Sequence, residues 1–154
     1  MFSGSSGTDY QDTQITNDGF WPDLNAGDFE KRRGIPADLN SDSIAFSLAA
    51  AIAQINIELT DLKATHQASG TAKASDVAGQ PMLGGKNLLV ILYEKAVFAR
   101  AKADLVPEFA TVQMRDAGDR VAESETDITD RLLAESQQHI RAIKGKSRCG
   151  VDLL

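Results

Sequence analysis

The stretch that decides the fold is residues 41–62, which read SDSIAFSLAAAIAQINIELTDL. Ser41 is a favourable N-cap residue, and Asp42 stands in the first turn, where the helix dipole favours a negative charge. Apolar residues then recur at steps of four and three, as one face of a helix requires; they are Ile44, Leu48, Ile52, Ile55, Leu59 and Leu62. The pattern predicts one long helix over residues 41–68.

Two further stretches have helical patterns. Residues 86–106 open with Leu88–Leu92, which are apolar on all sides, so this helix is expected to be central and to end before Pro107. Residues 122–144 are acidic in their first half and basic in their last turn, which agrees with the helix dipole. Gly145 is a natural stop for this third helix.

These patterns predict an all-α fold: an antiparallel bundle of three long helices plus a short N-terminal helix at residues 28–34. A flexible arm at residues 1–19, a helical domain at 20–145 and a C-terminal tail at 146–154 complete the expected organisation. The connection at 69–87 is unusually long, and such loops are often functional or mobile. The expected core contains Leu48, Ile52, Ile55, Leu59, Leu88, Leu92, Ala96, Ala99, Leu132 and Ile140.

The N-terminal arm has no apolar periodicity and is rich in Ser, Gly, Thr, Asp and Gln. Two large aromatics, Phe20 and Trp21, follow it, and Pro22 restricts Trp21 to an extended conformation. Such a pair either closes the edge of the chain's own core or enters a neighbour's pocket. We expect the arm with Phe20 and Trp21 to pack partly on a neighbouring subunit.

The charge is uneven along the chain. The net charge is −6, yet residues 1–40 carry seven acids against three bases, and residues 140–154 carry four bases against one acid. An acidic chain has no overall electrostatic attraction to nucleic acid or to an anionic membrane, whereas the asymmetry suits contacts between protein neighbours. One cysteine excludes an internal disulfide, and no apolar run is long enough to span a membrane or to act as a secretory signal.

Residues that could support catalysis are scarce. His66 and His139 lie far apart in sequence and have no acid or nucleophile at a suggestive spacing, and Cys149 stands alone. Residues 23–28 resemble a calcium loop but have Asp where the turn needs Gly. Gly84-Gly85-Lys86 resembles a phosphate loop, but Asn follows it where Ser or Thr is required. We therefore expect no enzyme activity, no metal and no cofactor.

Four segments together resemble a known family. They are residues 20–23 (Phe-Trp-Pro-Asp), 56–59 (Asn-Ile-Glu-Leu), 93–97 (Tyr-Glu-Lys-Ala-Val) and 143–149 (Ile-Lys-Gly-Lys-Ser-Arg-Cys). In this order and spacing they resemble the head-completion (head–tail adaptor) protein of P2-like tailed phages, over roughly residues 20–152. Ser147 stands where the family pattern has Pro.

The resemblance implies a structural protein of the virion neck, made in the host cytoplasm. Such proteins form a homo-oligomeric ring, usually of twelve copies, under the portal protein. They receive the tail, through a tail terminator or neck protein, on the other side, and DNA only passes through the ring. A different class of function, a small cytoplasmic helical regulatory or partner-binding protein, differs in assembly and would be a monomer or dimer.

The C-terminal tail is the expected portal-docking segment. It follows a helix stop, it is basic on an otherwise acidic chain, and it ends in apolar residues with no evident partner within the chain. Charge would steer the docking, and the apolar end would supply buried area. The expected docking residues are Lys144, Lys146, Arg148, Cys149, Val151, Leu153 and Leu154.

Overall fold

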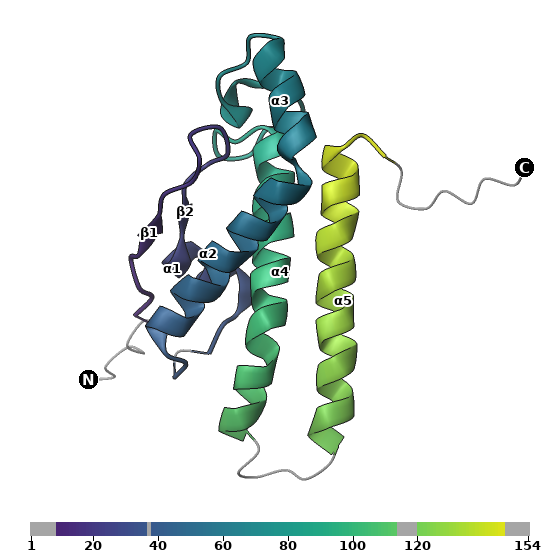
Figure 1. Cartoon of the computed structure of the whole chain (residues 1–154). Coiled ribbons are helices and arrows are strands. Elements are labelled where there is room, and N and C mark those ends of the chain that lie inside the picture. The colour runs from purple at the N-terminus through teal and green to yellow at the C-terminus, as the bar shows by residue number, and fades with distance from the viewer. Residues whose placement is uncertain (1–8, 37, 114–119, 147–154) are drawn as a thin grey trace, which may run out of the picture.

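The computed structural model describes residues 9–36, 38–113 and 120–146. In chain order the elements are β1 (Gln14–Ile15), β2 (Leu24–Asn25), α1 (Ala26–Arg33), α2 (Ser41–Glu58), α3 (Thr60–Ala68), the 3-10 turn η1 (Ala74–Asp76), α4 (Leu88–Gln113) and α5 (Arg120–Ile143). Helices α4 and α5 run side by side in opposite directions, and α2 crosses the first half of α4 obliquely (Figure 1).

The mainly helical class is confirmed, but the predicted arrangement is not. The strands β1 and β2 form a two-stranded antiparallel sheet, which the sequence patterns did not indicate. The expected antiparallel bundle of three long helices is not confirmed, because α2 crosses α4 obliquely and does not run alongside α4 and α5 (Figure 1). None of the described helices is by itself long and apolar enough to cross a membrane, and α2 with α3 passes that test only when the two are counted together.

The first predicted helix is broken at Leu59, and its two parts, α2 and α3, are bent by 63°. The Thr60 hydroxyl donates to the carbonyl oxygens of Asn56 and Ile57, 3.1 and 2.9 Å away. Such bonds from a Thr side chain compete with the helical ladder and bend helices. The N-cap of α2 is Asn40 and not Ser41, because the Asn40 side chain accepts from the backbone N–H of the second and third helical residues.

Other helix ends also differ from the prediction. Helix α1 begins at Ala26, two residues early, because the cap is Asn25 and not Asp28. Helix α4 does not stop before Pro107 but continues to Gln113. Its last part is stabilised by side-chain packing against α5, in a second apolar cluster of Ala103, Val106, Leu132 and Phe109. Proline inside a helix removes one hydrogen bond, and this packing offsets the loss.

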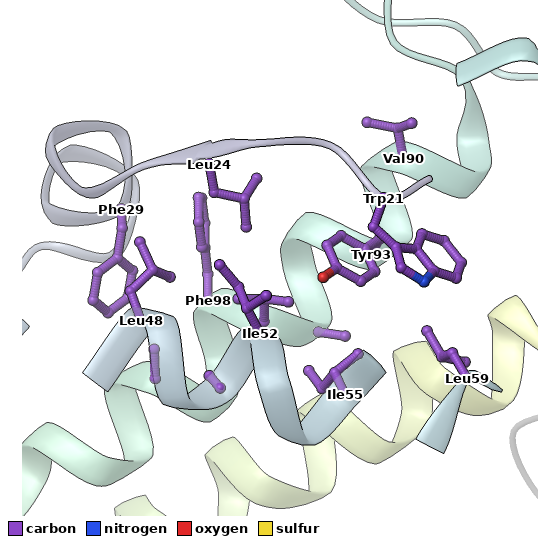
Figure 2. Packing of buried hydrophobic residues seen from close by; sticks show 14 of the residues in the cluster. Trp21, Leu24, Phe29, Leu48, Ile52, Ile55, Leu59, Val90, Tyr93 and Phe98 are labelled. Carbon is purple, nitrogen blue, oxygen red and sulfur yellow. The ribbon is translucent and has the colours of Figure 1, made fainter. Parts of the chain in front are cut away.

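The main core lies between α1, α2 and α4 (Figure 2). Eight of the ten predicted core residues are buried; Leu88 and Leu92 are only half-buried. On α4 the side chains that face α2 are Tyr93 and Val97, both fully buried. Neighbouring residues on a helix point about 100° apart. In a segment that is apolar on all sides, the sequence does not show which of these directions faces the core.

The arm is not unstructured over residues 9–19, where the prediction was wrong. Ile15 of β1 pairs with Leu24 of β2, and the backbone N–H of Ala26 donates to the Thr13 carbonyl oxygen at 2.9 Å. The Gln11 side chain donates to Glu30 of α1. Residues 1–8 lie outside the described part of the chain.

The connection at residues 69–87 is attached to the body through its first half, where the backbone N–H of Ala74 donates to the Phe20 carbonyl oxygen at 2.9 Å. Asn87 donates to the carbonyl oxygens of Ala74 and Val77, at 2.8 and 2.6 Å, and accepts from the N–H of Val90. A tight turn closes between Leu83 and Lys86, with both intervening glycines at positive φ. The turn leaves Leu83 72% exposed.

Candidate functional site

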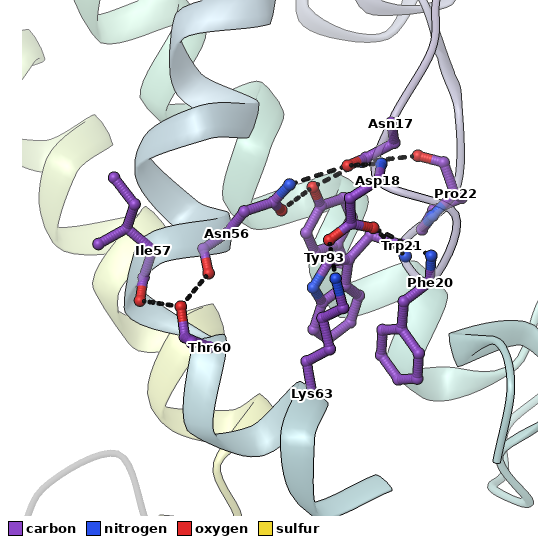
Figure 3. A network of polar contacts seen from close by, with 10 residues as sticks. All are labelled: Asn17, Asp18, Phe20, Trp21, Pro22, Asn56, Ile57, Thr60, Lys63 and Tyr93. Atoms are coloured by element: carbon purple, nitrogen blue, oxygen red, sulfur yellow. Dashed lines mark hydrogen bonds and ion pairs between the residues drawn. The ribbon is translucent and has the colours of Figure 1, made fainter. Parts of the chain in front are cut away.

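Segments of the family resemblance meet in one junction between the arm, α2 and α4 (Figure 3). The hydroxyl of Tyr93 donates to Asn56 at 2.6 Å, the amide of Asn56 donates to Asn17 at 2.8 Å, and the amide of Asn17 donates to the Tyr93 oxygen at 2.9 Å. Trp21 stacks on the Tyr93 ring with centroids 4.6 Å apart and an interplanar angle of 4°. Burial raises the pKa of Tyr93, so its hydroxyl stays protonated and keeps donating.

Phe20 and Trp21 lie inside this junction. They are 3% and 2% exposed within a single chain, and their rings meet edge to face at 4.9 Å. Almost nothing of either side chain is left for the neighbouring subunit that the sequence analysis expected. The inter-subunit role of both residues is therefore corrected to a core role, because both are buried within one chain, Trp21 on Tyr93 of α4 and Phe20 on His66 of α3.

Asp18 closes the turn before the aromatics. Its carboxylate accepts from the backbone N–H groups of Phe20 and Trp21, at 3.0 and 2.9 Å, and pairs with Lys63 of α3 at 2.8 Å. Burial opposes its ionisation, but these hydrogen bonds outweigh burial and lower the pKa of Asp18. The arm is thus attached to α3 as well as to α2 and α4.

The polar triangle supplies the first prediction. Asn56→Ala removes the acceptor of the buried Tyr93 hydroxyl and should lower the free energy of unfolding by about 1–3 kcal/mol. In a Tyr93→Phe background the same substitution should cost clearly less, because the hydroxyl that needed a partner is gone. Equal costs in the two backgrounds, measured by urea denaturation, would show that the pair is not coupled.

Charged side chains connect the remaining elements. Glu94 of α4 is 6% exposed, and its two carboxylate oxygens pair with Arg32 of α1 and Lys86, each at 2.7 Å. Arg100 pairs with Glu58, joining α4 to the end of α2. Each of these contacts joins groups from different elements, so they set how the helices are placed.

The carboxylate of Glu135 joins helix α5 to α1. Arg33 binds both oxygens of Glu135, at 3.0 and 2.9 Å, and the side chain of Gln137 donates to Glu58 at 3.2 Å. The hydrogen bonds from Arg33 lower the pKa of Glu135. At Glu58, burial raises the pKa, but hydrogen bonds from Arg100 and Gln137 outweigh it and lower the pKa overall.

These shifts predict acid sensitivity. Asp18, Glu58 and Glu135 have folded pKa values below their ordinary values of 3.8 and 4.5, so the unfolded chain binds their protons first as the pH falls. Their stabilisation is complete well above pH 4.5 and is lost as the pH falls through the lower folded values. Burial lowers the pKa of His139, which acts in the same direction as the three carboxylates. Burial raises the pKa of Asp104, which acts in the opposite direction at one group against four.

We expect the free energy of unfolding in urea to decrease between pH 6 and pH 3, and Glu135→Gln to make that decrease smaller. A free energy that is constant or rises over this range would contradict the assignment.

Only part of the expected docking segment can be located. Lys144 and Lys146 are both exposed just after α5, on either side of Gly145, which has a φ of +72°. The backbone N–H of Lys146 donates to the Arg141 carbonyl oxygen at 2.8 Å, so the helix is closed in the way that a left-handed glycine allows. The other expected docking residues lie outside the described part of the chain: Arg148, Cys149, Val151, Leu153 and Leu154.

The structure brings together the first three motif segments. Over residues 9–36, 38–113 and 120–146, no three His, Cys, Asp or Glu side chains are grouped so as to hold a metal ion. The helical pattern of residues 86–106 gave no sign of the buried roles of Tyr93 and Glu94. The signal that could have found them was the resemblance itself, since both residues belong to its third segment.

The comparisons with known proteins agree on one family. Residues 15–154 match the family described as phage head completion protein (GPL). The chain is 38% identical over 156 residues to the probable head completion/stabilization protein of Haemophilus phage HP1 (strain HP1c1), with all of both chains covered. It is 27% identical over 135 residues to the head completion/stabilization protein of Escherichia phage P2, covering 88% of this chain and 79% of that protein.

No solved structure was found to match the chain. The family match covers residues 15–154, which is nearly all of the chain, and the relative from phage HP1 is 38% identical over the full length. The chain therefore belongs to the phage head completion proteins, a family of structural, virion-associated assembly proteins.

Proposed function

We propose that this chain is a head–tail adaptor that forms a ring under the portal in the virion neck. In this role it completes and stabilises the DNA-filled head and offers the surface to which the tail attaches. The names of both relatives, head completion/stabilization protein, support the first part of the role. The ring, with twelve copies, and its partners, the portal protein and a tail terminator or neck protein, follow from the family resemblance.

The observation that carries the proposal is the opposite charge of the two ends of the α4–α5 pair. At the end where α4 finishes and α5 begins, the described side chains include the acids Asp104, Glu108, Asp127 and Asp130 and the base Arg131. At the other end, α5 finishes with the exposed Lys144 and Lys146. A ring of parallel copies would therefore have one acidic face and one basic face, suited to two different partners.

The basic end is proposed to meet the portal. Residues 144–154 follow α5 in the sequence, and they carry the bases Lys144, Lys146 and Arg148 ahead of the apolar residues Val151, Leu153 and Leu154. The bases would steer and orient the approach, while the apolar residues would be buried on docking. DNA would pass through the ring without being gripped, because an acidic chain offers few phosphate contacts.

The test of the proposal is an electron micrograph of particles produced without this protein. We expect heads that are filled with DNA, or that have leaked it, and that carry no tails, together with free tails. Normal tailed particles without the protein would contradict the adaptor role. Membership of a virion-associated family leaves the alternative of a cytoplasmic regulator without support.

A further inference from the structure

The outer face of α2 is apolar although it is exposed to solvent. Phe46 and Ile57 are each 75% exposed, and the exposed Ala50 and Ala53 lie between them. Phe46 and Ile57 are eleven residues apart, which is about three helical turns and 16 Å, so they share one side of α2. Residues 43–57 contain no ionisable side chain. Two large apolar side chains on an uncharged helix face mark an interaction surface.

This face points away from the rest of the chain. The buried residues of α2 include Ile44 and Ile55, and each lies two positions, or about 200° of rotation, from Phe46 or Ile57. Figure 3 shows Ile57 on the side of α2 opposite to Tyr93. No other described element covers these two side chains, which is why they remain exposed.

An apolar groove lies on the opposite side of α4. It has a volume of about 470 Å³ and is lined by Leu83, Ile91, Lys95, Lys86, Arg32 and Glu94, together with Gly84. Tyr93 bonds to α2, so Ile91 and Lys95, each two positions from Tyr93, lie on the side of α4 that faces away from α2. Leu83 and its neighbour Met82 are 72% and 57% exposed beside the groove.

The face and the groove complement each other in charge. The uncharged stretch of α2 is preceded by the exposed Asp42 and followed by the exposed Asp61, while Glu58 is paired with Arg100. The groove carries three bases, Arg32, Lys86 and Lys95, and one acid, Glu94, which pairs with the first two of them, so the groove keeps a net positive charge. A copy with a net charge of −6 repels another copy over most of its surface. Such copies could still make contact where the apolar face, which has acids at its ends, meets the apolar groove, which has bases around it.

We propose that these two surfaces join neighbouring copies of this chain: the α2 face with Phe46 and Ile57 enters the Leu83–Ile91 groove of the next copy. Two different patches on opposite sides of one molecule make a head-to-tail contact, and head-to-tail contacts generate rings when the rotation closes. The inference rests on the proposed adaptor function, which requires a ring, and it assigns the surfaces that build the ring. The uncharged face also argues against DNA as the occupant, because it has no cation to offer to phosphates.

Cross-linking in assembled particles tests the contact. Ile57→Cys and Leu83→Cys are combined in a Cys149→Ser chain, so that only the introduced thiols react with a short bismaleimide. We expect a ladder of covalent multimers from the double variant, and no multimers from either single variant or from the control pair Ile57→Cys with Ala134→Cys. Ala134 is exposed on α5, away from the groove. Particles that contain the double variant but give no ladder would overturn the proposal.

Lysine cross-linking of the same particles distinguishes a failure of this inference from a failure of the proposed function. If it gives multimers where the cysteine pair gives none, copies meet through another surface, and only this inference fails. If it gives no multimers either, the ring fails, and the proposed function fails with it.

Single charge insertions provide a second measurement that does not depend on thiol geometry. Phe46→Asp and Leu83→Asp should each reduce infectious particles by roughly tenfold or more, because an unpaired carboxylate would be buried in the contact. Both variants should keep the helix content of the unmodified chain, since both positions are exposed in the isolated subunit. Ala134→Asp is the matched control with no expected loss. Normal infectivity of both variants would overturn the proposal.

Discussion

Replacing Trp21 with alanine is expected to lower the free energy of unfolding of the isolated subunit by about 3–5 kcal/mol, which is typical of a large aromatic removed from a core. Trp21 is 2% exposed and stacks on Tyr93, while Phe20 meets its edge. Its removal leaves a cavity between the arm, α2 and α4, and the polar triangle around Tyr93 loses its cover. Urea denaturation of the purified chain, followed by circular dichroism, measures the loss.

Phe46→Ala is the matched control for this prediction. Phe46 is also a large aromatic, but it is 75% exposed, so its removal should change the free energy of unfolding by only about 0.5 kcal/mol or less. A cost below about 1 kcal/mol for Trp21→Ala would mean that the subunit folds without the aromatic anchor. The role of Phe20 and Trp21 between subunits would then become the better explanation.

The second large effect is expected at the other end of the chain. Truncation after Gly145 should reduce attachment to portal-containing heads by roughly a hundredfold or more, while helix content stays unchanged because α5 ends at Ile143. The truncation removes two bases and the apolar residues Val151, Leu153 and Leu154. Burial of such side chains contributes about 1.5–3 kcal/mol each, and a hundredfold is about 2.7 kcal/mol. Co-sedimentation of the labelled protein with heads gives the affinity.

Charge reversal separates steering from burial in the tail. Lys146→Glu with Arg148→Glu should slow association and lessen its dependence on salt, because exposed charges act over a Debye length of about 8–10 Å at moderate ionic strength. Reversal of the exposed Lys31 and Lys73 changes the net charge equally but alters no residue of the segment 144–154, and it should have a smaller effect. Undiminished attachment of the protein truncated after Gly145 would contradict the proposal that residues 146–154 dock on the portal.

Helix existence was predictable here because apolar periodicity is a local property. The stripe from Ile44 to Leu59 is buried as expected, and helices occupy all three predicted stretches. The predictions that failed concern features that depend on residues distant in sequence but close in space. Which side of α4 faces the core could not be predicted from Leu88–Leu92, because every side of that segment is apolar. Packing against α2 buries Tyr93 fully and leaves Leu92 half-buried.

The junction was hidden for a related reason. Asn17 lies in a polar segment that reads as a frayed terminus, yet its partners are Asn56 and Tyr93, 39 and 76 residues away. Polar side chains carry no periodicity, so composition alone could not distinguish an arm in solution from one held by specific hydrogen bonds. The bidentate pair between Arg33 and Glu135 joins residues 102 positions apart, and no local sequence pattern predicted it.

The most direct test of the adaptor role is reconstitution of tail attachment. DNA-filled heads from particles made without this protein are mixed with purified tails, with and without the purified chain, and infectious particles are counted. The account predicts that heads gain tails and infectivity only when the chain is added, and that the chain truncated after Gly145 does not replace it. Tails that join such heads equally well without the chain would contradict the central claim.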